Sequence, residues 1–135
     1  MPTDSSGTGS GPCTIAPWLS VRKSAQAVEF YKAAFGATEV FRLEDGGGGV
    51  VARLSVGGAE VWVSDESPEH ANFSPQTLGG GTVRMILTVA DPDAVFAKAV
   101  KAGASQVSAV EEQHGWRAGR VADPYGHHWE IGREV

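Results

Sequence analysis

The chain has 135 residues, of which 41% are hydrophobic and 20% are charged, and its formal net charge is −5. This composition is typical of one globular domain with its own core. The acidic balance, without any basic run, argues against nucleic acid or an anionic membrane as the main partner. No apolar stretch approaches the ~18 residues of a membrane span. Cys13 is the single cysteine, so no intrachain disulfide is expected, which fits a cytoplasmic protein.

The first half of the chain predicts a short tail followed by an alternating module. Residues 1–11 are rich in Gly, Ser, Thr and Pro and predict a flexible tail without signal-peptide features, and residues 12–135 predict one domain. In the helix of the first module, Ser24 is the expected N-cap and Gly36 the stop. The module covers residues 12–66, and its expected elements are a strand at 14–21, a helix at 24–37 and antiparallel strands at 38–44, 50–56 and 59–66.

The second half predicts the same order of elements after a linker. Residues 67–81 contain two prolines and three glycines, a composition typical of a connecting segment. In the helix that follows, Asp91 is the expected N-cap and Gly103 the stop. This module covers residues 82–135, and its expected elements are a strand at 82–89, a helix at 91–103, and strands at 104–111, 116–122 and 127–133, the last two joined by the turn "DPYG".

The two halves also agree in spacing. Val21 before the first helix and Val89 before the second are 68 residues apart, and so are Gly58 and Gly126, each of which precedes a last strand. A constant offset at both ends of a unit indicates an internal duplication. The sequence therefore predicts an α+β protein made of two strand-helix-strand-strand-strand modules.

Two segments carry a resemblance to a known family. "VRKSAQAVEFYKAAFGA" and "ADPYGHHWEI" are similar to the first helix and the last turn and strand of the vicinal oxygen chelate superfamily, which includes glyoxalase I, bleomycin-resistance proteins and extradiol dioxygenases. "HGWRAGRVADPYGHHW" is similar to its PhnB-like branch, and the resemblance covers residues 13–134. It implies that two βαβββ modules form a curled mixed sheet around a cup-shaped cavity, and that the protein is a homodimer.

The resemblance also implies four positions for metal ligands. Carried over by register, they are Ala16, Trp62, Arg84 and Glu130. Catalytic zinc needs about three protein ligands, and non-haem iron typically binds two histidines and one carboxylate. Of the four side chains, only Glu130 can donate to a metal. We therefore predict no metal cofactor.

The segment "HHWE" is predicted to contribute polar groups to the cup instead. Alternation points His128 and Glu130 to one face of the last strand. The first and last strands of a module are neighbours in this fold, so Arg84 is expected beside Glu130. The pair is either a clamp for an anionic or hydrogen-bonding ligand, or an internal salt bridge in the former metal position. A divalent metal at a relocated site, drawing on Glu60 with His128 and Glu130, is the remaining alternative.

Aromatic side chains are predicted to line the other part of the cup. Trp18 and Trp62 are expected to wall a small-molecule pocket, or alternatively to fill the cup themselves. Arg53 is expected at an exposed edge, with a second cationic contact as the alternative. His127 is expected to be structural, bonding turn carbonyls or Asp123. The same alternation turns four further side chains toward the cavity: Ala16, Ser64, Ile86 and Thr88.

These features favour a glyoxalase/bleomycin-resistance-like protein that binds a small molecule without metal. The expected ligand-binding residues are Trp18, Trp62, Arg84, His128 and Glu130. The alternatives are a metal-dependent glyoxalase-like lyase or isomerase, an extradiol-type dioxygenase, and a structural module whose cup is filled by its own side chains. No Gly-x-Ser-x-Gly elbow is present, and whether the protein is an enzyme stays open at this point.

Overall fold

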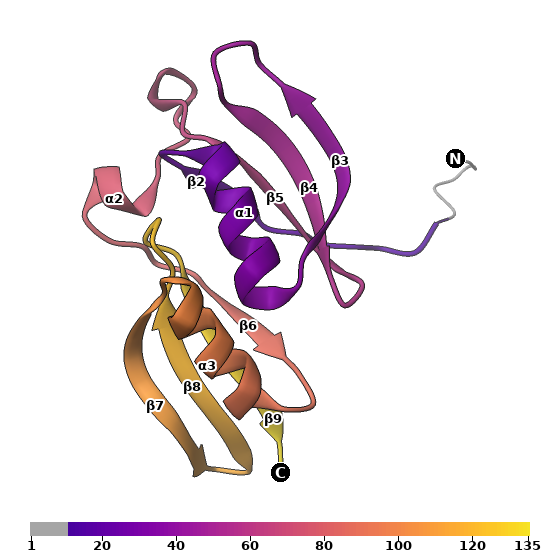
Figure 1. The fold of residues 1–135 in the computed structure, drawn as a ribbon, viewed down its shortest axis with the longest axis vertical. Coiled ribbons are helices and arrows are strands. Elements are labelled where there is room, and N and C mark those ends of the chain that lie inside the picture. The colour runs from indigo at the N-terminus through magenta and orange to yellow at the C-terminus, as the bar shows by residue number, and fades with distance from the viewer. Residues whose placement is uncertain (1–10) are drawn as a thin grey trace.

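The computed structural model describes residues 11–135, so the predicted tail lies outside the described residues except for Gly11. The chain forms two four-stranded mixed sheets, each accompanied by one long helix (Figure 1). The elements in chain order are β2 (Trp18–Val21), α1 (Ser24–Phe35), β3 (Thr38–Glu44), β4 (Val50–Val56), β5 (Ala59–Asp65), the 3₁₀ turn η1 (Pro68–His70), α2 (Pro75–Leu78), β6 (Arg84–Thr88), α3 (Pro92–Ala102), β7 (Ser105–Gln113), β8 (Trp116–Ala122) and β9 (His128–Glu134).

The two sheets repeat one topology, as the duplication predicts. Their strand orders are β2-β5-β4-β3 and β6-β9-β8-β7, and in each the first and last strands of the module pair in parallel. Trp18 lies opposite Trp62 in the first sheet, and Ile86 lies opposite Glu130 in the second. The α+β class is confirmed. The strands form two mixed sheets, one from each module, and neither sheet is closed.

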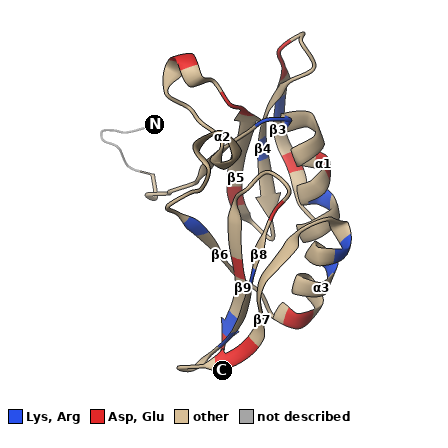
Figure 2. Ribbon diagram, turned by 90° about the vertical axis from the view of Figure 1, so that its left-hand side faces the viewer, with Lys and Arg blue, Asp and Glu red and all other residues tan. Residues whose placement is uncertain are grey.

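The core lies on the helix side of both sheets. Along α1 the buried side chains fall at helical spacing, Ala27, Val28, Tyr31 and Ala34 among them. Helices α1 and α3 contact each other as well as their own sheets, and both lie on the same side of the molecule (Figure 2). The opposite sheet faces consequently carry exposed side chains, including Ile86, which is 60% exposed.

The N-terminal cap agrees with the prediction in α3 and differs from it in α1, whereas Gly36 and Gly103 end the two helices as predicted. Asp91 accepts from the Ala94 amide and caps α3, as predicted. Ser24 is not the cap of α1: its hydroxyl accepts from the Val50 amide, and its own amide donates to a carboxylate oxygen of Asp65, 2.9 Å away. A side chain from β5 therefore satisfies an amide in the first turn of α1 in place of a local cap.

Two predicted boundaries also change. The first strand begins at Trp18 rather than at residue 14, and Pro17, which cannot donate an amide hydrogen, immediately precedes it. The linker is not without structure, because residues 67–81 contain η1 and α2. Ser74 caps α2 by accepting from the Thr77 amide. No helix among residues 11–135 is long and apolar enough to cross a membrane.

The buried carboxylate of Asp123 joins the two modules. It is 4% exposed and accepts hydrogen bonds from the Tyr31 hydroxyl of α1 and from the indole nitrogen of Trp129, 2.9 Å away. Its other oxygen accepts from the backbone amides of Tyr125 and His127. Four donors match the acceptor capacity of an ionised carboxylate, which makes its burial tolerable.

Tyr31→Phe tests this junction. The change removes one donor from a buried carboxylate, so we expect the free energy of unfolding to fall by about 1–3 kcal/mol in urea denaturation. Tyr125→Phe is the matched control, because the Tyr125 hydroxyl donates to the side-chain amide oxygen of Gln26, 3.2 Å away, and not to a buried carboxylate. Tyr125→Phe should lower the free energy of unfolding by clearly less than Tyr31→Phe does. Equal losses of stability in the two variants would contradict the role given to Asp123.

Burial, with the Asp123 carboxylate next in importance, raises the pKa of the Tyr31 phenol well above its usual range. The stability contributed by the neutral phenol is therefore complete below the unfolded pKa of about 10 and is lost as the pH rises through the higher folded pKa. The difference in stability between wild type and Tyr31→Phe should accordingly stay constant from pH 7 to about pH 9.5 and shrink above it. Denaturation curves across that range measure the difference.

Candidate functional site

An aromatic cluster covers the solvent side of the first sheet. The rings of Trp18 and Trp62 stack with centroids 5.3 Å apart and planes 6° from parallel, and Phe41 lies 6.0 Å from Trp62. The Arg53 guanidinium carbon lies 5.4 Å from the centre of the Trp62 ring. We call these four residues the aromatic face. Because Trp18 is 53% exposed, the stack is open to solvent and does not fill a closed cavity.

Strand pairing explains the stack. The parallel register of β2 and β5 places Trp18 directly opposite Trp62, and Arg53 of β4 is the antiparallel neighbour of Trp62. The indole nitrogen of Trp18 donates to the Ser64 hydroxyl at 2.8 Å, which fixes the orientation of the ring. The expectation that Arg53 sits at an exposed edge is wrong, because β4 is an inner strand and the Arg53 side chain is half-buried under the indole.

A polar cluster occupies the same side of the second sheet. Arg84 Nε donates to Glu130 Oε1 at 2.8 Å, so the neighbourhood expected from the register is present. An Arg120 guanidinium nitrogen lies 4.0 Å from the same carboxylate oxygen. His128 begins β9 as the register partner of Arg84. We call Arg84, Arg120, His128 and Glu130 the polar face, and it carries two guanidinium groups for one carboxylate.

The linker lines one side of an open hollow beside the polar face. Its volume is about 620 Å³, and we call it the linker hollow. The lining comes from Arg84, Arg120 and His128 of the sheet and from the linker, where apolar Phe73 and Leu78 lie beside the glycines of residues 79–81. Small residues leave the backbone amides of the linker accessible, so the hollow combines apolar walls with polar groups.

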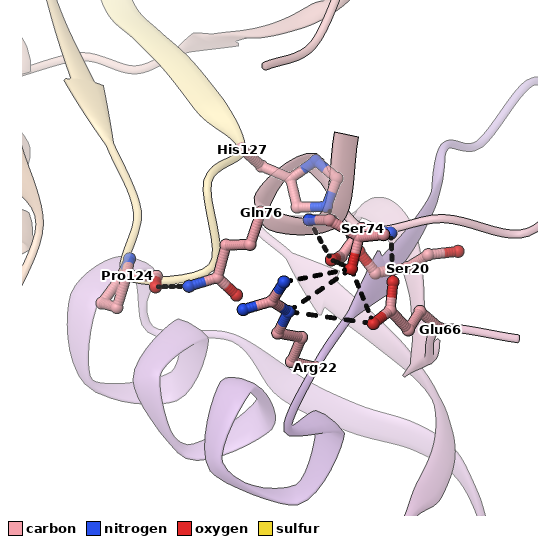
Figure 3. Close-up of polar contacts among 8 residues, drawn as sticks. Ser20, Arg22, Glu66, Ser74, Gln76, Pro124 and His127 are labelled. Carbon is pink, nitrogen blue, oxygen red and sulfur yellow. Dashed lines mark hydrogen bonds and ion pairs between the residues drawn. The ribbon is translucent and has the colours of Figure 1, made fainter. Parts of the chain in front are cut away.

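Hydrogen bonds hold the linker in place (Figure 3). Glu66 accepts from the Ser74 amide at 2.9 Å and from the Thr77 hydroxyl at 2.9 Å, and Arg22 approaches the same carboxylate at 3.8 Å. On the other side, the Nε2 atom of His127 lies 3.0 Å from the Ser20 carbonyl oxygen. His127 thus contacts the first module with its ring, while its amide binds Asp123 as expected.

The Ser74 amide, followed by the Thr77 hydroxyl, holds the pKa of Glu66 below its usual range. Ionised Glu66 therefore stabilises the fold above the unfolded pKa of about 4.3, and that contribution is lost as the pH falls through the lower folded pKa. Glu66→Gln should be less stable than wild type at pH 7, and the difference should narrow at pH 3.5. Urea denaturation at both pH values measures it.

Glu69→Gln provides the control for Glu66→Gln, because Glu69 is an exposed carboxylate of the same linker. It should leave the stability unchanged at both pH values. A pH-independent loss in Glu66→Gln would show that the variant disturbs packing rather than removing an ionised clamp.

The structure brings the predicted residues together in two groups. Trp18 and Trp62 belong to the first sheet, while Arg84, His128 and Glu130 belong to the second. Sequence reasoning did not include Arg120, although its alternation on β8 and its pairing opposite Glu130 are the signal that would have found it. Phe41 was also missed, because nothing local in "TEVFRLE" distinguishes its two faces.

The residues at the inherited metal positions do not fit a divalent cation. Ala16 and Trp62 offer no donor, and two arginines surround Glu130, the one usable ligand. Between residues 11 and 135 no three side chains of His, Cys, Asp or Glu gather in a group that could hold a metal. Glu60, proposed for a relocated site, lies on the first sheet, 3.8 Å from Arg53.

A model of the glyoxalase-like domain family matches residues 18–132. The chain belongs to this family. An uncharacterized protein of Mycobacterium tuberculosis (strain ATCC 25618 / H37Rv) is 41% identical over 126 residues, which cover 90% of this chain and 74% of that protein. The fold is similar to that of TioX from Micromonospora sp. ML1, with a TM-score of 0.71 and 27% identity over 91% of this chain and 100% of TioX.

Two more distant structures share the fold alone. A member of the glyoxalase/bleomycin resistance protein/dioxygenase superfamily from Sphaerobacter thermophilus has a TM-score of 0.70 at 20% identity, covering 91% of this chain and 98% of its own. The fosfomycin resistance protein FosX from Listeria monocytogenes, solved with Mn(II) and 1S,2S-dihydroxypropylphosphonic acid, has a TM-score of 0.70 at 14% identity, covering 95% and 93%.

Proposed function

We propose that this glyoxalase-like protein binds a planar small molecule without a metal ion. The observation that carries the proposal is the open indole stack of Trp18 and Trp62, with Arg53 packed beneath it. Two parallel, stacked rings offer a broad apolar surface at little conformational cost, and a third ring can extend the stack. The arginines around Glu130 support this choice over a metal enzyme, because they oppose the approach of a cation.

We infer that a second copy of the chain completes the site. The aromatic face and the polar face lie on separate sheets. Each of the two sheets also exposes apolar side chains to solvent. These include Trp18, Leu43, Ile86 and Val107. Pairing of two copies would cover such a surface and set the aromatic face of one opposite the polar face of the other, where Arg84, His128 or Glu130 holds the ligand.

Two further proposals follow from sequence. The similarity of "HGWRAGRVADPYGHHW" favours placement in the PhnB-like branch. The single cysteine and the acidic balance favour a cytoplasmic protein whose partner is a small molecule rather than nucleic acid or membrane.

Trp62→Ala tests the binding proposal. Loss of half of the indole stack should raise the Kd of a planar aromatic probe such as 2-naphthol by roughly tenfold, as measured by isothermal titration calorimetry. Val100→Ala is the control, since Val100 is an exposed apolar side chain of α3, away from both faces. It should leave the Kd unchanged. Unaltered affinity in Trp62→Ala, with an intact circular dichroism spectrum, would sink the proposal.

Light scattering after size-exclusion chromatography tests whether the protein is a homodimer. The wild type should have twice the chain mass of 14.1 kDa. Ile86→Asp places a charge on the exposed sheet face and should shift the protein toward monomer, whereas Val100→Asp, on the surface of α3, should not. A monomeric wild type at micromolar concentration would contradict the proposed pairing.

A further inference from the structure

The polar face has more donors than its own residues use. Among the described residues, the Arg84 guanidinium donates only to Glu130, through Nε, and both of its terminal nitrogens are without a partner there. The contact that Arg120 makes to Glu130 is 4.0 Å long, beyond hydrogen-bond distance. Within residues 11–135 neither Arg120 nor His128 donates a side-chain hydrogen bond. Two guanidinium groups therefore face one carboxylate that engages only one of their nitrogens.

These donors converge on one open hollow. Arg84, Arg120 and His128 all line the linker hollow of about 620 Å³. The other wall is the linker, which Glu66 holds against the first module. Of the residues that the structure describes, neither an Asp nor a Glu lines this hollow. Its electrostatic character is consequently cationic, although the whole chain has a net charge of −5.

We propose that the linker hollow binds an oxyanion (a carboxylate, phosphate or phosphonate group of the ligand) through Arg84 and Arg120. Planar guanidinium forks match the two oxygens of such a group, and the apolar side chains of Phe73 and Leu78 contact the adjoining part of the ligand. This inference rests on the proposed function, because it assigns the chemistry of the polar end of the same small molecule.

Glu130 acts in this arrangement as an internal competitor. Its carboxylate occupies Arg84 Nε when no ligand is present and keeps the guanidinium in the direction of the hollow. An entering oxyanion takes the terminal nitrogens of Arg84 and the donors of Arg120. Removal of the negative charge of Glu130 should thus strengthen anion binding, whereas a purely structural ion pair predicts no gain in binding.

The test is a titration of ¹⁵N-labelled full-length protein with inorganic phosphate, and separately with acetate, at constant ionic strength against chloride. We expect saturable shifts of the amide signals of residues 79–81 and His128 with at least one of the two oxyanions. Phosphate without acetate identifies a tetrahedral group, and the reverse a carboxylate. Equal responses to chloride, or no saturable shift with either, would overturn the proposal.

Variants separate this inference from the aromatic site. Arg120→Gln should weaken the binding of the responding oxyanion by roughly tenfold or more, and Glu130→Gln should tighten it. Arg133→Gln removes the same charge from an exposed position of β9 and should change nothing. If Arg120→Gln and Arg133→Gln weakened oxyanion binding equally, the effect would come from the net charge of the protein, and the proposed site would be contradicted. The binding of 2-naphthol depends on Trp62 and not on Arg120. A negative result in the oxyanion titration would therefore leave the proposed aromatic site standing.

Discussion

The carboxylate of Asp123 lies between the two modules and accepts hydrogen bonds from four donors on three parts of the chain. A buried charge without such donors would be very costly, so the donors and the carboxylate require one another. Tyr31 brings α1 to this point, and Trp129 brings β9. His127 follows the same turn, and its ring lies against the Ser20 carbonyl oxygen of the first module. The direction of β9, and with it the position of Glu130, depends on this junction.

The duplicated module supplies one backbone with two different surfaces. Equivalent positions carry Trp18 and Trp62 in the first sheet and Ile86 and Glu130 in the second. Parallel pairing at the same offset makes each pair adjacent, so a stacking surface and a charged surface arise from the same geometry. A protein with two copies of such a chain can oppose these unlike surfaces, which an assembly of identical half-sites cannot do.

The sequence predicted those features of the fold that local alternation, internal repetition and the family resemblance specify. Alternation and the offset of 68 residues predicted the two modules, and the family resemblance added the pairing of their first and last strands and with it the contact between Arg84 and Glu130. The sequence did not predict that Asp65 would serve α1 in place of Ser24, or that Glu66 would dock the linker. Those contacts join residues distant along the chain or lie within a segment without periodicity.

We propose that the ligand site operates without a bound metal. Elemental analysis tests it most directly, on protein purified without a histidine tag, incubated with Ni, Zn, Mn and Fe(II) and then desalted. The account predicts no stoichiometric retention, because three of the four inherited positions hold Ala16, Trp62 and Arg84. Retention of one metal per chain that is lost in Glu130→Ala would contradict it and identify a metal-dependent member of the family.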